Sequence, residues 1–233
     1  MRCVVIRVAL NKRYITLAPV ANLIGLAFTV EDPDKLLGNN TSGVTVALVE
    51  RGHPGLEQAY YHNPLDTGFP NGTIHGTIDI NISQVIGGED NIGNGWKMLM
   101  ECLAAGRGIC LPATANASSK VSTLAMLLYT QHRVQFKRPL IDMEGIQNKL
   151  ADMIYNTWII NTSVYVTNKI LDTGERPSVI SAIMKEQTTE RGRQVVNDAM
   201  DIYGGSGICK GPNNMIEKFY KNVPIGVTVE GSN

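Results

Sequence analysis

One carboxylate, Glu230, stands in a stretch whose other residues are apolar, small or uncharged. Residues 227–233 read VTVEGSN, so Glu230 follows a β-branched run and precedes a glycine. A carboxylate that is removed from water and aimed at a substrate can act as a general base. A solvated carboxylate near a chain end explains the same residues, and this stretch alone favours that simpler interpretation.

Three further clusters could bind an anion. Arg107 lies among small residues in LAAGRG, residues 103–108, where a ligand or a second backbone could approach. Residues 133–139 place three cations beside Phe136, and residues 201–207 hold glycines whose backbone N–H groups could cradle an anion. An arginine on a helix surface, cations at a helix C-terminus and a glycine helix stop explain the three clusters at least as well.

Motifs of other chemistries are missing from the sequence. There is no GxGxxG after a strand, no Walker loop, no HExxH and no GxSxG. The four histidines are scattered, so we expect surface or hydrogen-bonded histidines and no metal site. The cysteines have no CxxC spacing, which predicts buried free thiols and a reducing compartment. They are Cys3, Cys102, Cys110 and Cys209.

Composition narrows the class of protein. The 233 residues are 43 % hydrophobic, enough for one large domain or two small ones. Lys+Arg and Asp+Glu are both 21, so the formal net charge is zero and no basic field for nucleic acid is present. No apolar run approaches the ~20 residues of a membrane span. The first residues are too short and too soon interrupted for a signal peptide.

The first part of the chain has the pattern of β structure. We expect strands over residues 4–10, 13–17, 23–30, 44–49 and 73–82, with a loop-rich segment over 51–73. Short strands separated by Gly, Pro and Asn turns indicate a small antiparallel β barrel or sandwich. This predicts a β domain over residues 1–90.

Beyond a glycine-rich hinge at 87–95 the residues favour helices. The apolar period predicts helices over 96–132, 143–171 and 178–203, and a short one over 213–220. Pro112 should kink the first of these or require local repair. Three long helices and a short one indicate an up-and-down helical bundle over residues 91–233. A β block followed by an α block predicts an α+β fold with two packed domains.

Six short segments, taken together and in this order, resemble the acyl-CoA dehydrogenase family. They are residues 11–18 (NKRYITLA), 106–107 (GR), 133–136 (RVQF), 151–153 (ADM), 201–207 (DIYGGSG) and 229–231 (VEG). Residues 135–137 (QFK), 143–146 (MEGI) and 211–214 (GPNN) look like the bacterial long-chain fatty acyl-CoA branch of the family. Each segment is weak alone, but their joint order and spacing are specific.

The resemblance implies a fold and a place in a longer protein. The family has an N-terminal helical domain, a middle β domain and a C-terminal four-helix bundle. The likeness here covers the middle domain and most of the bundle. We therefore expect a fragment that lacks the first helical domain, the flavin-binding segment that opens the β domain, and the tail after Asn233.

The resemblance also implies that the protein binds FAD between these two domains. Tyr14 and Thr16 match positions that pack on and hydrogen-bond the flavin ring, where Tyr replaces the family's usual Trp. Other matching positions are expected to reach the FAD of a neighbouring subunit, with Arg133 on the pyrophosphate. The full set of expected cofactor contacts is Tyr14, Thr16, Arg133, Val134, Gln135, Phe136, Met143, Glu144, Asp201, Ile202, Tyr203, Gly204, Gly205 and Ser232. A family Gln often stands where this chain has Met143 and Glu144.

By the same resemblance the substrate is an acyl-CoA thioester. Glu230 matches the base that removes the α-proton, and its backbone N–H would polarise the thioester carbonyl. Hydride would pass from the β-carbon to the flavin, giving a trans-2-enoyl-CoA. Arg107 matches the arginine beside the base, so Glu230 and Arg107 are the expected catalytic pair. The expected substrate contacts are Ala104, Ala105, Gly106, Arg107 and Gly231.

Three functional readings follow. The first is α,β-dehydrogenation of long-chain fatty acyl-CoA in fatty acid β-oxidation, with electron-transfer flavoprotein or a similar acceptor. The second is an acyl-CoA oxidase that uses O₂, and the third is a non-catalytic fragment that does not retain FAD. A cofactor site shared across subunits implies a homodimer or homotetramer. We expect a cytoplasmic protein, or one peripheral to the inner membrane.

Overall fold

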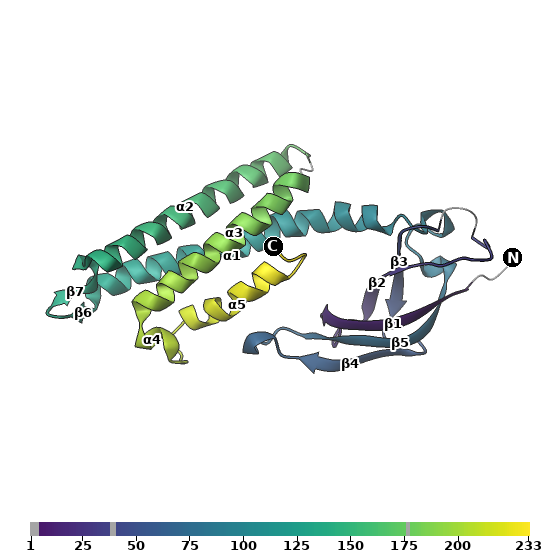
Figure 1. Ribbon diagram of the computed structural model, residues 1–233, viewed down its shortest axis with the longest axis horizontal. Helices are drawn as coiled ribbons and strands as arrows, with labels where there is room; N and C mark the ends of the chain where they lie inside the picture. The colour runs from purple at the N-terminus through teal and green to yellow at the C-terminus, as the bar shows by residue number, and fades with distance from the viewer. Residues whose placement is uncertain (1–4, 38–40, 176–177) are drawn as a thin grey trace. The chain divides into compact units, whose positions relative to one another are not determined.

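The computed structural model describes residues 5–37, 41–175 and 178–233 (Figure 1). Within this part the chain separates into two compact units, one up to Glu101 and one from Cys102 onward. The first unit is built mainly from strands and the second mainly from helices. Each unit has its own hydrophobic core.

Two antiparallel sheets form the first unit. The strands are β1 (Val5–Thr16), β2 (Leu23–Thr29), β3 (Val44–Glu50), β4 (Leu56–His62) and β5 (Asn71–Asn81). One sheet has the order β1-β5-β4, and the other pairs β2 with β3. Alternate residues of β1, from Ile6 to Leu10, point into the core, as expected for a strand with one solvated face. Short 3-10 turns follow at η1 (Pro64–Asp66), η2 (Ile82–Gln84) and η3 (Glu89–Asn91).

The two sheets share one core. Buried Ile, Val and Leu side chains from β1, β2, β3 and β5 form a single cluster, with Ile74, Ile78 and Ile80 of β5 almost fully enclosed. This arrangement is the sandwich form of the expected barrel or sandwich. No closed barrel is formed by the strands that the structure describes.

Two predictions about the strands were wrong. The strands expected over 4–10 and 13–17 are one strand, because a register shift between Lys12 and Ile15 absorbs the turn-like residues without ending the pairing with β5. The loop expected over 51–73 contains β4, which pairs with β5 from Leu56 to His62. β4 has no β-branched residue, so its strand conformation depends on its partner more than on its own propensity.

Five helices build most of the second unit in the part of the chain that the structure describes. They are α1 (Gly95–His132), α2 (Glu144–Asp172), α3 (Ser178–Tyr203), α4 (Gly205–Ile208) and α5 (Ile216–Thr228). The three long helices fall where the apolar period predicts them, and α1 continues through Pro112. Figure 1 shows α2 and α3 running alongside each other, and side-chain hydrogen bonds join α1 to α2 at Asn116–Asn161 and Thr123–Thr157.

The bundle core lies at the end of these helices where the α1–α2 connection is. Met126 of α1, Met153 of α2 and Val195 of α3 are almost fully buried in one cluster, which Ile216 of α5 completes. Burying a side chain of this size contributes about 1.5–3 kcal/mol each. The helices are therefore held together mainly by this apolar contact.

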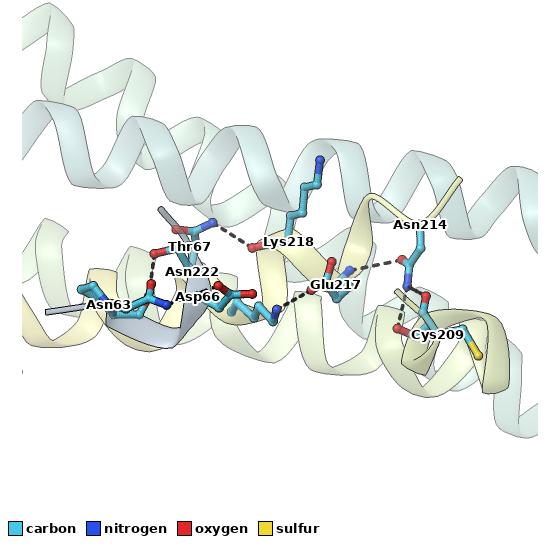
Figure 2. A network of polar contacts seen from close by, with 11 residues as sticks. Asn63, Asp66, Thr67, Cys209, Asn214, Glu217, Lys218 and Asn222 are labelled. Carbon is cyan, nitrogen blue, oxygen red and sulfur yellow. Dashed lines mark hydrogen bonds and ion pairs between the residues drawn. The ribbon is translucent and has the colours of Figure 1, made fainter. Parts of the chain in front are cut away.

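Helix α5 is longer than the short helix expected over 213–220. It continues to Thr228 and includes Pro224, so the β-branched run before Glu230 is helical. Asn214 fixes its start, because its Oδ1 accepts from the N–H of Glu217 at 3.2 Å and its Nδ2 donates to the carbonyls of Gly207 and Cys209 (Figure 2). The propensity of a Val- and Thr-rich run is overridden here by tertiary contacts of α5 with α3.

A hairpin that the sequence did not predict joins α1 to α2. Strands β6 (Val134–Gln135) and β7 (Arg138–Pro139) pair with Gln135 opposite Arg138, leaving a two-residue loop. Phe136 and Lys137 both have positive φ, 52° and 65°. These angles match the tight hairpin turns that strongly favour Asn-Gly, so Lys137 is held in a conformation that suits glycine better.

Lys137→Gly is expected to stabilise the protein by up to about 1 kcal/mol, because a left-handed conformation costs a non-glycine residue about that much. Urea unfolding followed by helical circular dichroism would measure the gain. Lys120→Gly, at an exposed position inside α1, is the matched control and should lose about 1 kcal/mol. A loss of stability in Lys137→Gly would contradict the strain assigned to the hairpin.

The cysteines differ from expectation in exposure. Cys102, Cys110 and Cys209 are free thiols, as predicted, but all three are exposed and not buried. Cys102 and Cys110 lie on α1, and Cys209 follows α4; Cys3 lies outside the described residues. Among the described residues no helix is both long and apolar enough to cross a bilayer.

Candidate active site

Glu230 lies just beyond the C-terminus of α5. Val229 closes the helix by donating to the carbonyl of Ile225 at 2.9 Å, and the chain then turns sharply. Glu230 has φ of 54° and Gly231 has φ of 86°, so both adopt the left-handed conformation. Such a conformation is strained for Glu and persists only where surrounding contacts impose it. The side chain of Glu230 is exposed and free to meet a ligand.

The bend brings the Glu230–Gly231 segment against α1 at Gly106 and Arg107. A methyl group built on Gly106 would lie 3.9 Å from Oε1 of Glu230, so the carboxylate passes close to the bare helix backbone. A methyl group built on Gly231 would lie 3.8 Å from the Arg107 guanidinium. The predicted base, its predicted arginine and the two predicted glycines therefore meet in one place. The side chains of Ala104 and Ala105 lie outside the described part.

Arg107 contributes a partly buried cation to this place. Its Nε is buried and has no hydrogen-bond partner among the described residues. A buried donor without a partner carries a desolvation penalty that a ligand acceptor could relieve. The guanidinium therefore supplies positive charge beside Gly231, and its buried Nε is a donor without a partner in the described part.

Lys185, which belongs to none of the motifs recognised in the sequence, is hydrogen-bonded to residues on both sides of the same bend. Lys185 belongs to α3 and its side chain is completely buried, at 0 % exposure. Its Nζ donates to the carbonyl oxygens of Val227 and Gly231 and to Oδ1 of Asn233, each at 2.6 Å. The three ammonium hydrogens thus find three acceptors around Glu230.

The charge of Lys185 is influenced by its neighbours. Burial lowers the pKa of the Lys185 ammonium, and the Arg107 guanidinium lowers it further, while the Glu190 and Glu230 carboxylates oppose this shift. Three oxygen atoms accept hydrogen bonds from Nζ, and the protonated amine has the three N–H donors that this requires. The structure therefore holds Lys185 as an ammonium ion.

Asn233 completes the network from the opposite side. Its Nδ2 donates to Oγ1 of Thr189 at 3.0 Å and to the carboxylate of Glu190 at 3.2 Å. Its backbone N–H reaches the carbonyl of Val227 at 3.4 Å. The segment around Glu230 is therefore tied to α3 through Lys185, Thr189 and Glu190.

A signal for Lys185 was present in the sequence. The buried residues of α3 recur with helical period through Ser181, Met184, Thr188 and Gly192, and Lys185 falls on this buried face. A lysine where the period calls for an apolar residue indicates a buried, paired charge. The sequence could not show its acceptors, because they lie 42 to 48 residues further along the chain.

The predicted residues 133–136 lie on the hairpin after α1. Phe136 is 89 % exposed at the hairpin tip, and Arg133 and Gln135 are exposed beside it. The hairpin is anchored by hydrogen bonds from Arg133 N–H to Tyr129 O at 2.8 Å and from Leu140 N–H to Arg133 O at 2.9 Å. An exposed aromatic ring beside a guanidinium is suited to a flat, anionic ligand.

Met143 and Glu144 start α2 close to this hairpin. Met143 is the N-cap residue of α2, and Glu144 is exposed in its first turn. A carboxylate in the first turn of a helix is stabilised by the helix dipole. This is a sufficient structural reason for Glu144, and it adds negative charge where an anionic ligand would prefer none.

The predicted glycine turn lies at the same end of the bundle. The Tyr203 ring packs edge-on against Tyr129 of α1, with ring centroids 4.8 Å apart. Asp201 and buried Asp198 bind Nζ of Lys149 at 2.9 and 2.8 Å, and these bonds raise the pKa of Lys149, with the Asp198 bond contributing most. Gly204, at φ of 59°, then ends α3 and Gly205 begins α4.

The predicted residues around Glu230 and those of the hairpin after α1 are far apart along the bundle. His132, which precedes the hairpin, follows Arg107 by 25 positions on the single helix α1. At about 1.5 Å per residue this separates them by about 37 Å. The residues of the hairpin end therefore cannot contact a small molecule that lies against Glu230 of the same chain.

Tyr14 and Thr16 lie on β1 in the first unit. The Tyr14 ring is 68 % exposed, with the His62 ring 5.2 Å away and the Arg13 guanidinium 5.6 Å from its centre. Thr16 stands at the end of β1 opposite Asn71, whose Nδ2 lies 3.5 Å from its hydroxyl oxygen. Both side chains are thus available at the strand end. No group of His, Cys, Asp and Glu suited to a metal occurs among the described residues.

Comparison with known proteins identifies the family. The family described as acyl-CoA dehydrogenase, C-terminal domain, matches residues 93–233, which is more than half of the chain. The chain belongs to the acyl-CoA dehydrogenase family. The resemblance drawn from the short motifs is thereby confirmed.

Relatives within this family match over nearly the whole chain. Cyclohex-1-ene-1-carbonyl-CoA dehydrogenase from Geobacter metallireducens is 28 % identical over 232 residues, which cover 96 % of this chain and 57 % of the relative. A 3-(aryl)acrylate reductase from Clostridium sporogenes is 28 % identical over 228 residues, covering 95 % and 56 %. The chain therefore spans little more than half the length of the curated relatives it matches.

Solved structures support the same fold. Butyryl-CoA dehydrogenase from Megasphaera elsdenii superposes with a TM-score of 0.84 at 22 % identity, covering 98 % of this chain and 57 % of that structure. The likeness confirms the α+β architecture of a β domain followed by a helical bundle. At this identity it does not extend to substrate or activity.

Proposed function

We propose that this chain carries the α-proton base of an FAD-dependent acyl-CoA dehydrogenase, with Glu230 as that base. One observation carries the proposal: the carboxylate is held at a strained left-handed bend, against the bare backbone of Gly106 and beside the Arg107 guanidinium. Strained conformations cluster at functional sites because the surrounding fold must support them. The relatives, which are named for reactions of acyl thioesters and acrylates, supply the reaction class.

The described residues fit FAD by their chemistry. Tyr14 offers an exposed ring and Thr16 a hydroxyl for the flavin, while the hairpin offers an exposed phenyl ring and guanidinium. The Gly204 N–H donates to the carbonyl of Met200 at 3.0 Å, so the glycine turn offers the backbone N–H of Gly205 for a phosphate. When bound, FAD supplies a two-electron acceptor for the hydride that leaves the β-carbon. The negative charge of Glu144 argues against a phosphate contact at that position.

The chain's own residues would then act on the α-carbon. A thioester seated against Glu230 would displace water from the carboxylate, which raises its basicity toward the α-proton. The Glu230 backbone N–H would donate to the thioester carbonyl as negative charge develops there. Gly231 leaves room for the acyl chain to pass close to the backbone, and Arg107 holds positive charge beside the developing anion.

A flavin titration tests the proposal. The FAD-loaded protein is expected to be yellow and to lose its flavin absorbance when saturated acyl-CoA is added without oxygen. A series from short to long acyl chains would test our further proposal that long chains are preferred. Absence of bleaching with every acyl-CoA would overturn the proposal. A colourless protein with intact helices would support the alternative of a chain that does not retain FAD.

The same preparation separates a dehydrogenase from an oxidase. We propose electron-transfer flavoprotein, or a similar acceptor, as the redox partner. Reduced enzyme is then expected to reoxidise slowly in air and rapidly with that acceptor. Rapid reoxidation by O₂ alone would favour the acyl-CoA oxidase instead.

We also propose that the protein works as a homo-oligomer. The hairpin end lies about 37 Å along α1 from Arg107, so its FAD-suited residues would serve the site of a second copy. Helix α2 also exposes large apolar side chains, among them Trp158 and Tyr165, with 63 and 64 % of their surface accessible. Exposed apolar patches of this kind mark protein interfaces.

Trp158→Glu is expected to lower the apparent mass in light scattering after size exclusion, because a charge would be buried in the interface. Asn148→Glu adds the same charge to an exposed polar position of α2 and is the matched control. Helical circular dichroism should be unchanged in both variants. An unchanged apparent mass for Trp158→Glu would show that this face of α2 does not form the interface.

A further inference from the structure

Lys185 is a buried cation whose contacts all converge on one short segment. Removing an ammonium ion from water is costly unless hydrogen bonds compensate for the lost hydration. Its three acceptors are the carbonyl of Val227, the carbonyl of Gly231 and Oδ1 of Asn233. All three belong to the seven residues that surround Glu230.

The positions of these acceptors are informative. Val227 lies in the last turn of α5, where carbonyl oxygens lack helical partners and a cation is favoured by the helix dipole. Gly231 directly follows Glu230, so its carbonyl is reached only if the chain reverses at Glu230. Lys185 thus fixes the backbone three residues before the carboxylate and one residue after it.

The charged groups around Lys185 come from each segment packed against it. Arg107 approaches from α1, Glu190 from the next turn of α3, and Glu230 from the bend itself. Glu190 also accepts a hydrogen bond from Asn233. Lys185, Thr189 and Glu190, which all bind Asn233, therefore all belong to α3. Helix α3 is itself fixed in the bundle core through Val195, which is completely buried.

We propose that Lys185 is a positioning residue for Glu230. Its ammonium group imposes the left-handed bend and thereby sets the carboxylate against Gly106 and Arg107. The inference rests on the proposed function only where it treats Glu230 as the base. The hold of Lys185 on residues 227–233 is a property of the chain alone.

Hydrogen exchange measures this hold directly. Lys185→Met keeps the volume of the side chain and removes all three donors. We expect exchange at Val229 and Asn233, whose N–H groups bond Ile225 and Val227, to become faster by about tenfold or more. Lys149→Met is the matched control, because Lys149 joins α2 to α3 through Asp198 and Asp201 and does not touch the bend. Equal exchange in both variants would overturn the proposal.

Kinetics separate positioning from general stability. In FAD-loaded protein, Lys185→Met is expected to slow flavin bleaching by about 100-fold, the loss typical of a small misplacement of a reacting group, with little change in the acyl-CoA concentration for half-saturation. Adding Glu230→Gln to Lys185→Met should cause no further loss beyond Glu230→Gln alone, since both changes act through one carboxylate. Additive losses would show that Lys185 does not act through Glu230.

A milder variant guards against misfolding. Asn233→Ala removes one acceptor of Lys185 at an exposed position, together with the bonds to Thr189 and Glu190. It should increase hydrogen exchange at Val229 by less than Lys185→Met does. If Lys185→Met fails to fold, exchange at Val229 in Asn233→Ala tests the proposal instead, and unchanged exchange would overturn it. If wild-type protein shows no bleaching, the proposed function fails, while the exchange result still decides whether Lys185 holds the bend.

Discussion

Replacement of Glu230 by Gln is expected to abolish flavin bleaching by acyl-CoA while FAD stays bound. Gln has nearly the same shape as Glu and can occupy the same bend, but it cannot accept the α-proton. Loss of a positioned general base typically costs about 100- to 10,000-fold in rate. Stopped-flow absorbance under anaerobic conditions would measure the loss.

The control for this experiment is Glu186→Gln. It makes the same chemical change on α3, one residue beyond Lys185, at a carboxylate that accepts a hydrogen bond from Nε2 of the neighbouring Gln187 at 2.6 Å. The control should bleach at the wild-type rate. If Glu230→Gln bleaches near the wild-type rate, Glu230 is not the base and the proposed function loses its central residue.

Two glycines of α1 are expected to respond in opposite directions to alanine. A methyl group on Gly108 would lie 2.7 Å from Oγ and 3.0 Å from Cβ of Ser181, so α1 and α3 would have to separate. Overpacking of this kind costs about 1–3 kcal/mol, which exceeds the gain in helix propensity of about 1 kcal/mol. Gly108→Ala should therefore destabilise the bundle, and Gly108→Val should do so by about 3 kcal/mol or more.

Gly106→Ala meets no such obstacle. Among the described residues, a methyl group on Gly106 would have one near neighbour, Oε1 of Glu230 at 3.9 Å, so the helix should gain up to about 1 kcal/mol. The methyl group would occupy space in front of the carboxylate, and flavin bleaching should slow. Gly145→Ala, in open space near the start of α2, is the control and should gain stability without changing the rate. Urea unfolding and bleaching rates of the four variants test both statements. A stabilised Gly108→Ala would show that α1 and α3 are not in close contact there.

The parts of the fold that local pattern determines could be predicted from the sequence. Helices α1, α2 and α3 follow from an apolar period of 3.6, because that period decides which face is buried. Strand β4 could not be predicted, since its residues become a strand by pairing with β5. The second half of α5 was missed for a related reason, because its Val- and Thr-rich residues are helical through their contact with α3.

Only the residues of the candidate site that belong to the family's sequence motifs could be predicted. Family likeness named Glu230, Arg107, Gly106 and Gly231, and the fold brings these four together. Lys185 has no part in those motifs, and its role depends on acceptors more than 40 residues away. The left-handed bend at Glu230 was also beyond sequence reasoning, because nothing local requires a glutamate to adopt it.

The length of α1 between Arg107 and the hairpin has a genetic consequence. If each site takes its base from one copy and its hairpin from another, then two defective proteins can repair each other. One copy altered at Glu230 and another altered at Arg133 would assemble mixed oligomers with some intact sites, so two inactive alleles would complement. A single copy carrying both alterations would contribute neither part, and no partner of the same kind could restore it.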